Sequence, residues 1–136
     1  MKSQQYARDI QSHLLNGGPA PVPLSQSNLY LSLHFGDPGS NNSQEHLEVP
    51  GVDRVAISRN AISWISEGET SINRSLISTK PAAAYEGNRI ATHWALGTSA
   101  TGQGQMKISG KLTTPQQIVA GMILDFPAGA IKIDEF

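Results

Sequence analysis

The chain lacks cysteine and has few charges, few aromatic residues and no long apolar run. None of its 136 residues is a cysteine, which excludes disulfides and cysteine-ligated metal sites. Its apolar runs are far shorter than the ~18 residues that a membrane-spanning helix requires. Residues 1–15 contain no uninterrupted apolar stretch of the secretory kind. We therefore expect a soluble protein that is made in a cytoplasm and has no membrane partner.

The low charge restricts the partners further. Asp, Glu, Lys and Arg make up 15% of the chain, and the formal net charge is −1. Typical soluble domains carry about 25% charged residues. A protein that binds a polyanion is normally more basic than this, so we expect no nucleic-acid partner. A weakly charged surface is poor at keeping copies apart, which favours a protein that is packed in an assembly.

The N-terminal segment, residues 1–23, is predicted to be a helix followed by a stiff arm. Ser3–Leu15 has apolar residues at helical spacing and Ser3 as a possible N-cap. The apolar stripe consists of Tyr6, Ala7, Ile10 and Leu14. Gly17–Pro23 is rich in proline and glycine, which predicts an extended connection. A short helix with one narrow stripe must pack on another surface, either its own domain or a neighbour.

Residues 24–136 change to a period of two, which is typical of half-buried strands. In Leu29–Phe35 the odd positions are apolar, and Tyr30, Ser32 and His34 lie on the other face. The other predicted strands are Arg54–Ser58, Ala61–Ile65, Ser71–Ile77, Ile90–Leu96, Met106–Leu112, Gln117–Phe126 and Ala130–Ile133. The sequence therefore predicts a mainly β fold, an antiparallel β-sandwich of about seven or eight short strands with a short N-terminal helix.

The turns and strand faces can be predicted as well. Glu67-Gly68-Glu69 is expected to close a hairpin, and Pro127-Ala128-Gly129 to make a tight return. Thr113-Thr114-Pro115 is expected to end a strand, because proline has no amide to donate. Ser40–Glu48 is expected to be an exposed loop. The inward faces are predicted as Ile90, Thr92, Trp94 and Leu96 in one strand, and as Met106, Ile108 and Leu112 in the next, where Lys107, Ser109 and Lys111 point outward.

A search for chemistry finds no catalytic or metal-binding pattern. The four histidines fall on different predicted elements and are not spaced like metal ligands: His13, His34, His46 and His93. There is no G-x-S-x-G nucleophile elbow. The acidic residues Glu45 and Glu48 are expected to be solvated in a loop. The sequence therefore predicts a protein that is not an enzyme and has no cofactor. If the strands of His34 and His93 are neighbours, the two side chains are expected to meet at an interface.

The last third of the chain has a distinctive order of motifs. A strand with an aromatic residue, Ile90–Leu96, precedes a Gly/Thr turn and the segment Gly110-Lys111-Leu112-Thr113-Thr114-Pro115. The segment Ile118–Ile131 then ends in Phe126-Pro127-Ala128-Gly129-Ala130-Ile131. This order, with the strand and Asp37-Pro38-Gly39 turn near the N-terminus, resembles a family of small tailed-bacteriophage virion proteins, tail-fibre-like, minor structural or head-decoration proteins. Val52-Asp53-Arg54 only partly matches the segment that relatives carry there.

The resemblance implies a non-enzymatic virion structural protein, assembled in the host cytoplasm and present in multiple copies. Its place would be capsid decoration, the neck or collar, or the tail or fibre. Its partners would be other copies of itself and the capsid, neck or tail proteins. Candidate assembly contacts are Tyr6, Ile10, Leu14, Tyr30, His34 and His93. An alternative function is a receptor- or carbohydrate-binding module of a tail fibre, for which a few exposed aromatic residues would be needed.

Overall fold

The structure is a computed structural model that describes residues 15, 28–38, 43–58, 64–67, 70–74 and 76–134. Every element in these ranges except the single helical residue Leu15 is a strand, a turn or an irregular segment, so the predicted mainly β fold is confirmed. The predicted helix Ser3–Leu15 lies outside the described residues apart from Leu15 and gains no support. The proposed division into residues 1–23 and 24–136 remains a prediction.

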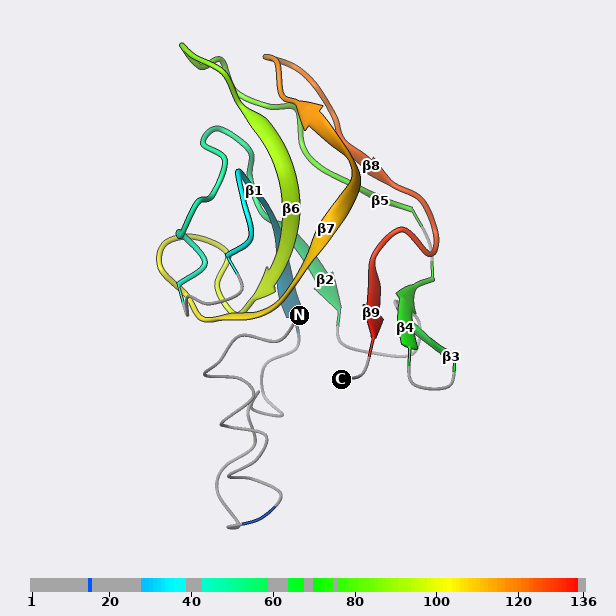
Figure 1. Cartoon of the computed structure of the whole chain (residues 1–136). Coiled ribbons are helices and arrows are strands. Elements are labelled where there is room, and N and C mark those ends of the chain that lie inside the picture. Colours follow the sequence, from blue (N-terminus) through cyan, green and yellow to red (C-terminus); the bar gives the residue numbers. More distant parts are fainter. Residues whose placement is uncertain are drawn as a thin grey trace.

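Nine strands are found in the described part of the chain (Figure 1). They are β1 (Asn28–His34), β2 (Val55–Ser58), β3 (Trp64–Glu67), β4 (Thr70–Asn73), β5 (Ile77–Ser78), β6 (Ile90–Gly97), β7 (Met106–Gln117), β8 (Asp125–Phe126) and β9 (Lys132–Asp134). They form a four-stranded sheet in the order β2-β1-β6-β7, a three-stranded sheet β3-β4-β9 and a pair β5-β8. All pairs are antiparallel. The sheets form an open version of the predicted sandwich, because in the described residues no hydrogen-bonded strand pair joins one sheet to another.

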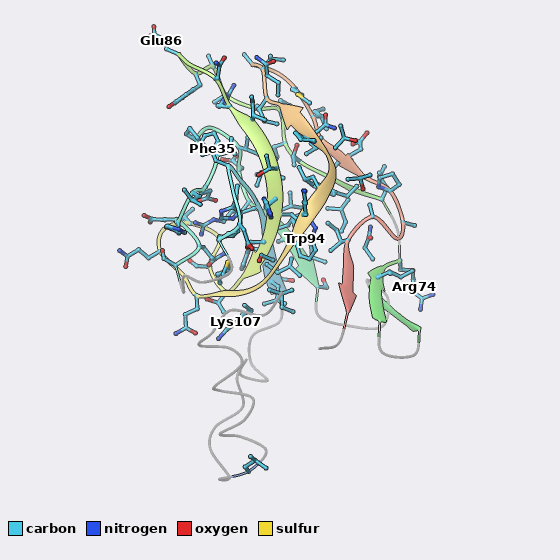
Figure 2. The ribbon with its side chains drawn as sticks, viewed as in Figure 1. Phe35, Arg74, Glu86, Trp94 and Lys107 are labelled. Carbon is cyan, nitrogen blue, oxygen red and sulfur yellow. The ribbon has the colours of Figure 1, made fainter. Side chains whose placement is uncertain are left out.

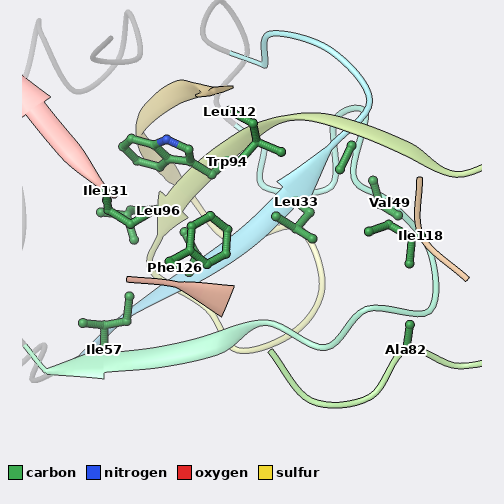
Figure 3. Packing of buried hydrophobic residues seen from close by; sticks show 12 residues of the cluster. Leu33, Val49, Ile57, Ala82, Trp94, Leu96, Leu112, Ile118, Phe126 and Ile131 are labelled. Carbon is green, nitrogen blue, oxygen red and sulfur yellow. The ribbon is translucent and has the colours of Figure 1, made fainter. Parts of the chain in front are cut away.

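The hydrophobic core lies between the four-stranded sheet and the β5–β8 pair (Figure 3). β1, β2, β6, β7 and β8 all contribute buried side chains, and so do the connecting segments. The buried cluster is Leu31, Leu33, Val49, Ile57, Ala82, Ala91, Trp94, Leu96, Leu112, Ile118, Phe126 and Ile131. Full burial of one large aliphatic or aromatic side chain stabilises a fold by about 1.5–3 kcal/mol. The stability of this domain therefore depends on contacts between strands that are distant in sequence.

β1 is buried on both faces, which the alternation alone does not predict. Leu31 and Leu33 lie in the core as predicted. The segment after β1 returns to that strand: the Val49 amide donates to the Leu33 carbonyl at 2.9 Å, and the His46 carbonyl lies 2.8 Å from Nδ1 of the His34 ring. Ser32 and His34 are consequently 3% and 0% exposed. The prediction of an open polar face on β1 is therefore wrong at Ser32 and His34. The predicted exposed loop over Ser40–Glu48 is confirmed at Glu45, His46 and Leu47, whereas Gln44 is buried.

A large irregularity separates the two ends of the β6–β7 pair. Ala91 faces Gln116 and His93 faces Lys111, so one residue of β6 stands opposite residues 112–115 of β7. Across the irregularity, the alternation of inward and outward side chains in β6 shifts by one residue. Ile90 is consequently 45% exposed and Ala91 is completely buried, contrary to the predicted faces. β7 does not end at Pro115 as predicted. Proline is tolerated there because no residue of β6 needs its missing amide proton.

The C-terminal part is less regular than predicted. Of the predicted strand Gln117–Phe126, Gln117 ends β7 and Asp125–Phe126 forms β8, and the residues between them are not a strand, because the chain turns at Gly121, whose φ is 80°. The tight return at residues 127–129 is confirmed by a hydrogen bond from the Ala130 amide to the Pro127 carbonyl at 2.9 Å. The predicted hairpin of β3 and β4 is also confirmed, since Glu67 pairs with Thr70. Its turn residues lie outside the described ranges.

Candidate functional site

The six predicted contact residues fall into two groups. Tyr6, Ile10 and Leu14 lie outside the described residues. Tyr30 is half-buried in β1, and His34 in β1 is the direct antiparallel partner of His93 in β6. The strands of the two histidines are thus neighbours, but the His34 ring bonds Ser32 and the His46 carbonyl, and the His93 ring bonds Thr92. The expected meeting of the two side chains at an interface stays a prediction. An assembly role for Tyr30 and His93 stays a prediction.

His34 does not have the surface position that the sequence predicts. Its ring is fully buried beneath residues 43–49. Nδ1 lies 2.8 Å from the His46 carbonyl oxygen and must carry the proton, because a carbonyl can only accept. Nε2 lies 2.7 Å from Ser32 Oγ and accepts a hydrogen bond from the Ser32 hydroxyl group. This hydrogen-bonded serine and histidine resemble a nucleophile and its base. At 3% and 0% exposure, however, they have no access to a substrate.

Burial lowers the pKa of His34 below its usual 6.5, and the hydrogen bond to the His46 carbonyl and the Glu48 carboxylate only partly oppose this effect. The unfolded chain therefore takes up a proton at His34 before the folded chain does, and the stability due to neutral His34 is lost as the pH falls through and below about 6.5. We expect the urea midpoint to drop over this range in the native protein and to depend less on pH in His34→Gln. His46→Gln is the control, because it keeps the backbone carbonyl that His34 contacts. Equal slopes in all three proteins would contradict this assignment.

Beside His34, two buried polar side chains join residues 43–54 to the turn between β6 and β7. Gln44 is 0% exposed, its Nε2 donates to the Ser99 carbonyl at 3.2 Å, and its Oε1 accepts from the Ser99 amide at 2.9 Å. A Cβ atom at Gly97 or Gly104 would overlap the Gln44 side chain. These two glycines are therefore required for close approach, and Gly104 also has a positive φ of 36°.

Arg54 is the second joining residue. Its Nε and Nη2 donate to the two carboxylate oxygens of Glu48, each at 2.8 Å. Nη1 donates to the Ser99 carbonyl at 3.0 Å and Nη2 to the Gly102 carbonyl at 2.6 Å. The side chains of Arg54 and Glu48 are 4% and 19% exposed. Glu48 is thus not the solvated loop carboxylate that the sequence predicts, and this polar cluster holds two loops together.

Two seams remain where the sheets do not join. In the β7–β8 seam, Lys111–Gln116 of β7 face Leu124–Pro127, and in the β2–β5 seam, Val55–Ser58 face Leu76–Ser78. The first seam contains a pocket of about 200 Å³ and the second one of about 290 Å³. The β7–β8 seam lies beside the irregular part of β7. Irregularities of this kind redirect side chains and are frequent next to functional sites.

The β7–β8 pocket has an apolar base and a polar rim. Trp94, Leu112 and Phe126 form the base, and Trp94 occupies the middle of the molecule (Figure 2). The rim consists of Lys111, Thr113, Thr114, Gln116 and Asp125. Sequence reasoning missed this site. Its only signal in the sequence is the Thr-Thr-Pro motif, which by itself predicts the end of a strand.

Other kinds of site find little support in the described residues. These residues contain no group of three or more His, Asp or Glu side chains that could hold a metal ion. Over the same ranges, no helix is both long and apolar enough to cross a bilayer. Arg54 and Arg89 are largely or fully buried, and Arg89 donates to the Pro50 carbonyl at 3.1 Å. Neither arginine therefore contributes to a basic surface.

Comparison with known proteins gives one result that covers almost the entire sequence. A family model described as "Podophage GP4 fiber I protein gp80" matches residues 2–134. No curated protein matches the chain. The matched range includes the irregular strand β7, both seams and the polar cluster around Arg54.

Proposed function

The chain belongs to the podophage GP4 fiber I protein gp80 family, and on this premise we propose that it is a non-enzymatic component of the fibre or tail apparatus, present in multiple copies. The matching family model covers residues 2–134, so the argument applies to the whole domain rather than to one motif. The family is one of phage structural proteins, which makes the chain a virion component. The fibre description favours the tail apparatus over capsid decoration or the neck.

Assembly in multiple copies is supported by the surface. Large apolar side chains that are more than a third exposed in the described ranges are Leu15, Phe35, Leu47, Leu76, Tyr85, Ile90, Val119 and Ile123. Phe35 and Leu47 are neighbours, because the Phe35 amide donates to the Leu47 carbonyl at 2.8 Å. Leu47 also has a φ of 58°, which is unfavourable for leucine. Symmetric repetition would multiply such small contacts into a stable assembly.

The open edges of the four-stranded sheet offer a second kind of contact. β2 and β7 are the outer strands of this sheet, and neither pairs with a further strand in the described part of the chain. Part of each edge faces the β5–β8 pair across a seam, and where nothing covers it, an unpaired edge is a template for pairing with another chain. Other copies of the chain, or neighbouring tail proteins, are therefore the partners that we propose.

Quantitative mass spectrometry of purified particles tests the proposal. We expect the protein in mature virions at a multiple of the portal or tail-tube copy number, and in the tail fraction after particles are separated into heads and tails. Native mass spectrometry of the isolated protein should show an oligomer. Absence from purified particles would refute a virion role, and a strictly head-associated signal would refute the proposed placement.

A further inference from the structure

The β2–β5 seam has an unpaired strand edge on each side. Val55–Ser58 of β2 face Leu76–Ser78, and no hydrogen bond joins the two segments in the described part of the chain. Successive residues of a strand point their N–H and C=O groups to opposite sides, so about half of these groups in β2 point into the seam. We propose that residues 19–24 of a neighbouring copy bind in this seam as an added strand. This inference rests on the multi-copy assembly proposed above and names a contact that holds the copies together.

The seam is closed at one end and open at the other. The Ala83 amide, which follows β5, donates at 2.8 Å to the carbonyl of Gly51, which precedes β2. Beyond that contact a pocket of about 290 Å³ separates the two segments. Leu76 lines this pocket and is 59% exposed. An added strand would pair with the edge of β2 and cover this leucine at the same time.

The lining of the seam indicates which side chains the added strand carries. Ile57 belongs to the buried core, and Val55 and Ile77 pack against that core. Small residues face the solvent along both segments: Ala56, Ser58 and Ser78. None of the described residues that line the pocket is charged. The added strand should therefore alternate apolar residues, which extend the core, with uncharged residues that face outward.

The segment before β1 has this pattern. In residues 19–24, which lie outside the described ranges, Ala20, Val22 and Leu24 alternate with three prolines. Residues two apart in a strand point their backbone groups to the same neighbour, so the amides of these three apolar residues can all pair with β2. The prolines would then face β5, which has only two residues. They do not prevent pairing with β2, and they disfavour a regular ladder on the other side.

The direction of β1 favours a neighbouring copy over the same chain. Asn28, the first residue of β1, pairs with Ser58, the last residue of β2. Residues 19–24 of the same chain, turned back along β2, would run parallel to it, because β1 and β2 are antiparallel. Parallel pairing is slightly less stable per residue, whereas the segment of a neighbour can pair antiparallel. Exchange of an identical segment between copies is also a low-cost route to an oligomer.

Disulfide cross-linking of the full-length protein tests the proposal, and the native chain contains no cysteine that would interfere. Pro21→Cys is combined with Ala56→Cys or with Ser58→Cys, because outward side chains of paired strands lie next to each other. After mild oxidation we expect linked dimers and larger species on a non-reducing gel, and peptide mass spectrometry should join position 21 to position 56 or 58. Pro21→Cys with Val119→Cys, at an exposed position outside the seam, is the matched control. Cross-links within one chain only, or none at either β2 position, would overturn the proposal.

A charge in the added strand provides a second measurement. Val22→Asp would place a carboxylate against the apolar wall of the seam, so we expect the dissociation constant of the oligomer to rise at least about tenfold in analytical ultracentrifugation. Gln26→Asp adds the same charge outside residues 19–24 and should leave the constant unchanged, while circular dichroism checks the fold of both variants. An oligomer that is as stable with Val22→Asp as in the native protein would refute the contact. If such an oligomer also occurs in particles, multi-copy assembly stands and only this contact is wrong.

Discussion

Trp94→Ala is expected to destabilise the domain by about 3–5 kcal/mol, a large share of the 5–15 kcal/mol typical of single domains. Trp94 is 3% exposed and belongs to the buried cluster between β6, β7 and β8 (Figure 3). Its removal deletes a large buried surface and leaves a cavity that the rigid strands cannot fill. Urea denaturation followed by circular dichroism measures the loss. Val119→Ala, at a position that is 55% exposed, is the control and should change stability by less than about 0.5 kcal/mol.

The partner of Trp94 permits a sharper version of this test. Gly110 is directly opposite Trp94 in β7, and a Cβ atom there would overlap the Cζ2 atom of the indole. Gly110→Ala alone should therefore cost about 1–3 kcal/mol through overpacking. In the Trp94→Ala background the same substitution should cost much less, because the overlapping ring is absent. A double-mutant cycle measures this coupling, and additive losses would show that the ring and the glycine do not depend on one another.

Arg54→Met is expected to have the second large effect, a loss of about 3 kcal/mol. The substitution leaves the Glu48 carboxylate without its partner, although Glu48 is only 19% exposed. It also removes hydrogen bonds to the Ser99 and Gly102 carbonyls, so the turn between β6 and β7 loses its attachment. Equilibrium urea denaturation measures the loss. Limited proteolysis should show earlier cleavage within residues 98–105, since a detached turn opens more often.

Three further variants separate the contributions of charge and geometry. Arg54→Lys keeps the positive charge but lacks the fork that matches both Glu48 oxygens, so it should recover only part of the stability. Arg54→Met combined with Glu48→Gln should be less damaging than Arg54→Met alone, because no unpaired charge is then buried. Lys80→Met, at an exposed position, is the surface control. An Arg54→Met protein as stable as this control would contradict the assigned role.

Some features of this protein were determined by the sequence alone. The alternation in Leu29–Phe35 correctly placed Leu31 and Leu33 in the core, because a strand has a side-chain period of two wherever it lies. Phe35 was the exception and is 37% exposed, since the strand ends before it. The return at residues 127–129 was predicted from turn chemistry, which acts between adjacent residues. The motif order of the last third also indicated the phage family correctly.

Only the tertiary structure decided which polar side chains are buried. Lys107, predicted to point outward, is 2% exposed, and its ammonium group donates to Gln105 Oε1 at 2.9 Å. Gln44 and His34 are also buried, and the segments that pack around them are distant in sequence. The sequence pattern of one strand describes that strand's two faces, but not what covers them. Coverage depends on long-range packing, which no local period records.

The same limit applies to the irregularity of β6 and β7 and to the pocket beside it. Local residue preferences predicted a strand end at Pro115, whereas the folded chain continues β7 to Gln117 with a new register. The register depends on which residues of β6 stand opposite, and these lie about twenty positions earlier in the chain. The mainly β class, the tight return at residues 127–129 and the family of this protein were thus readable from its sequence. The buried polar cluster, the register of β7 and the seam pocket were not, because each depends on pairing between segments that meet only in the folded state.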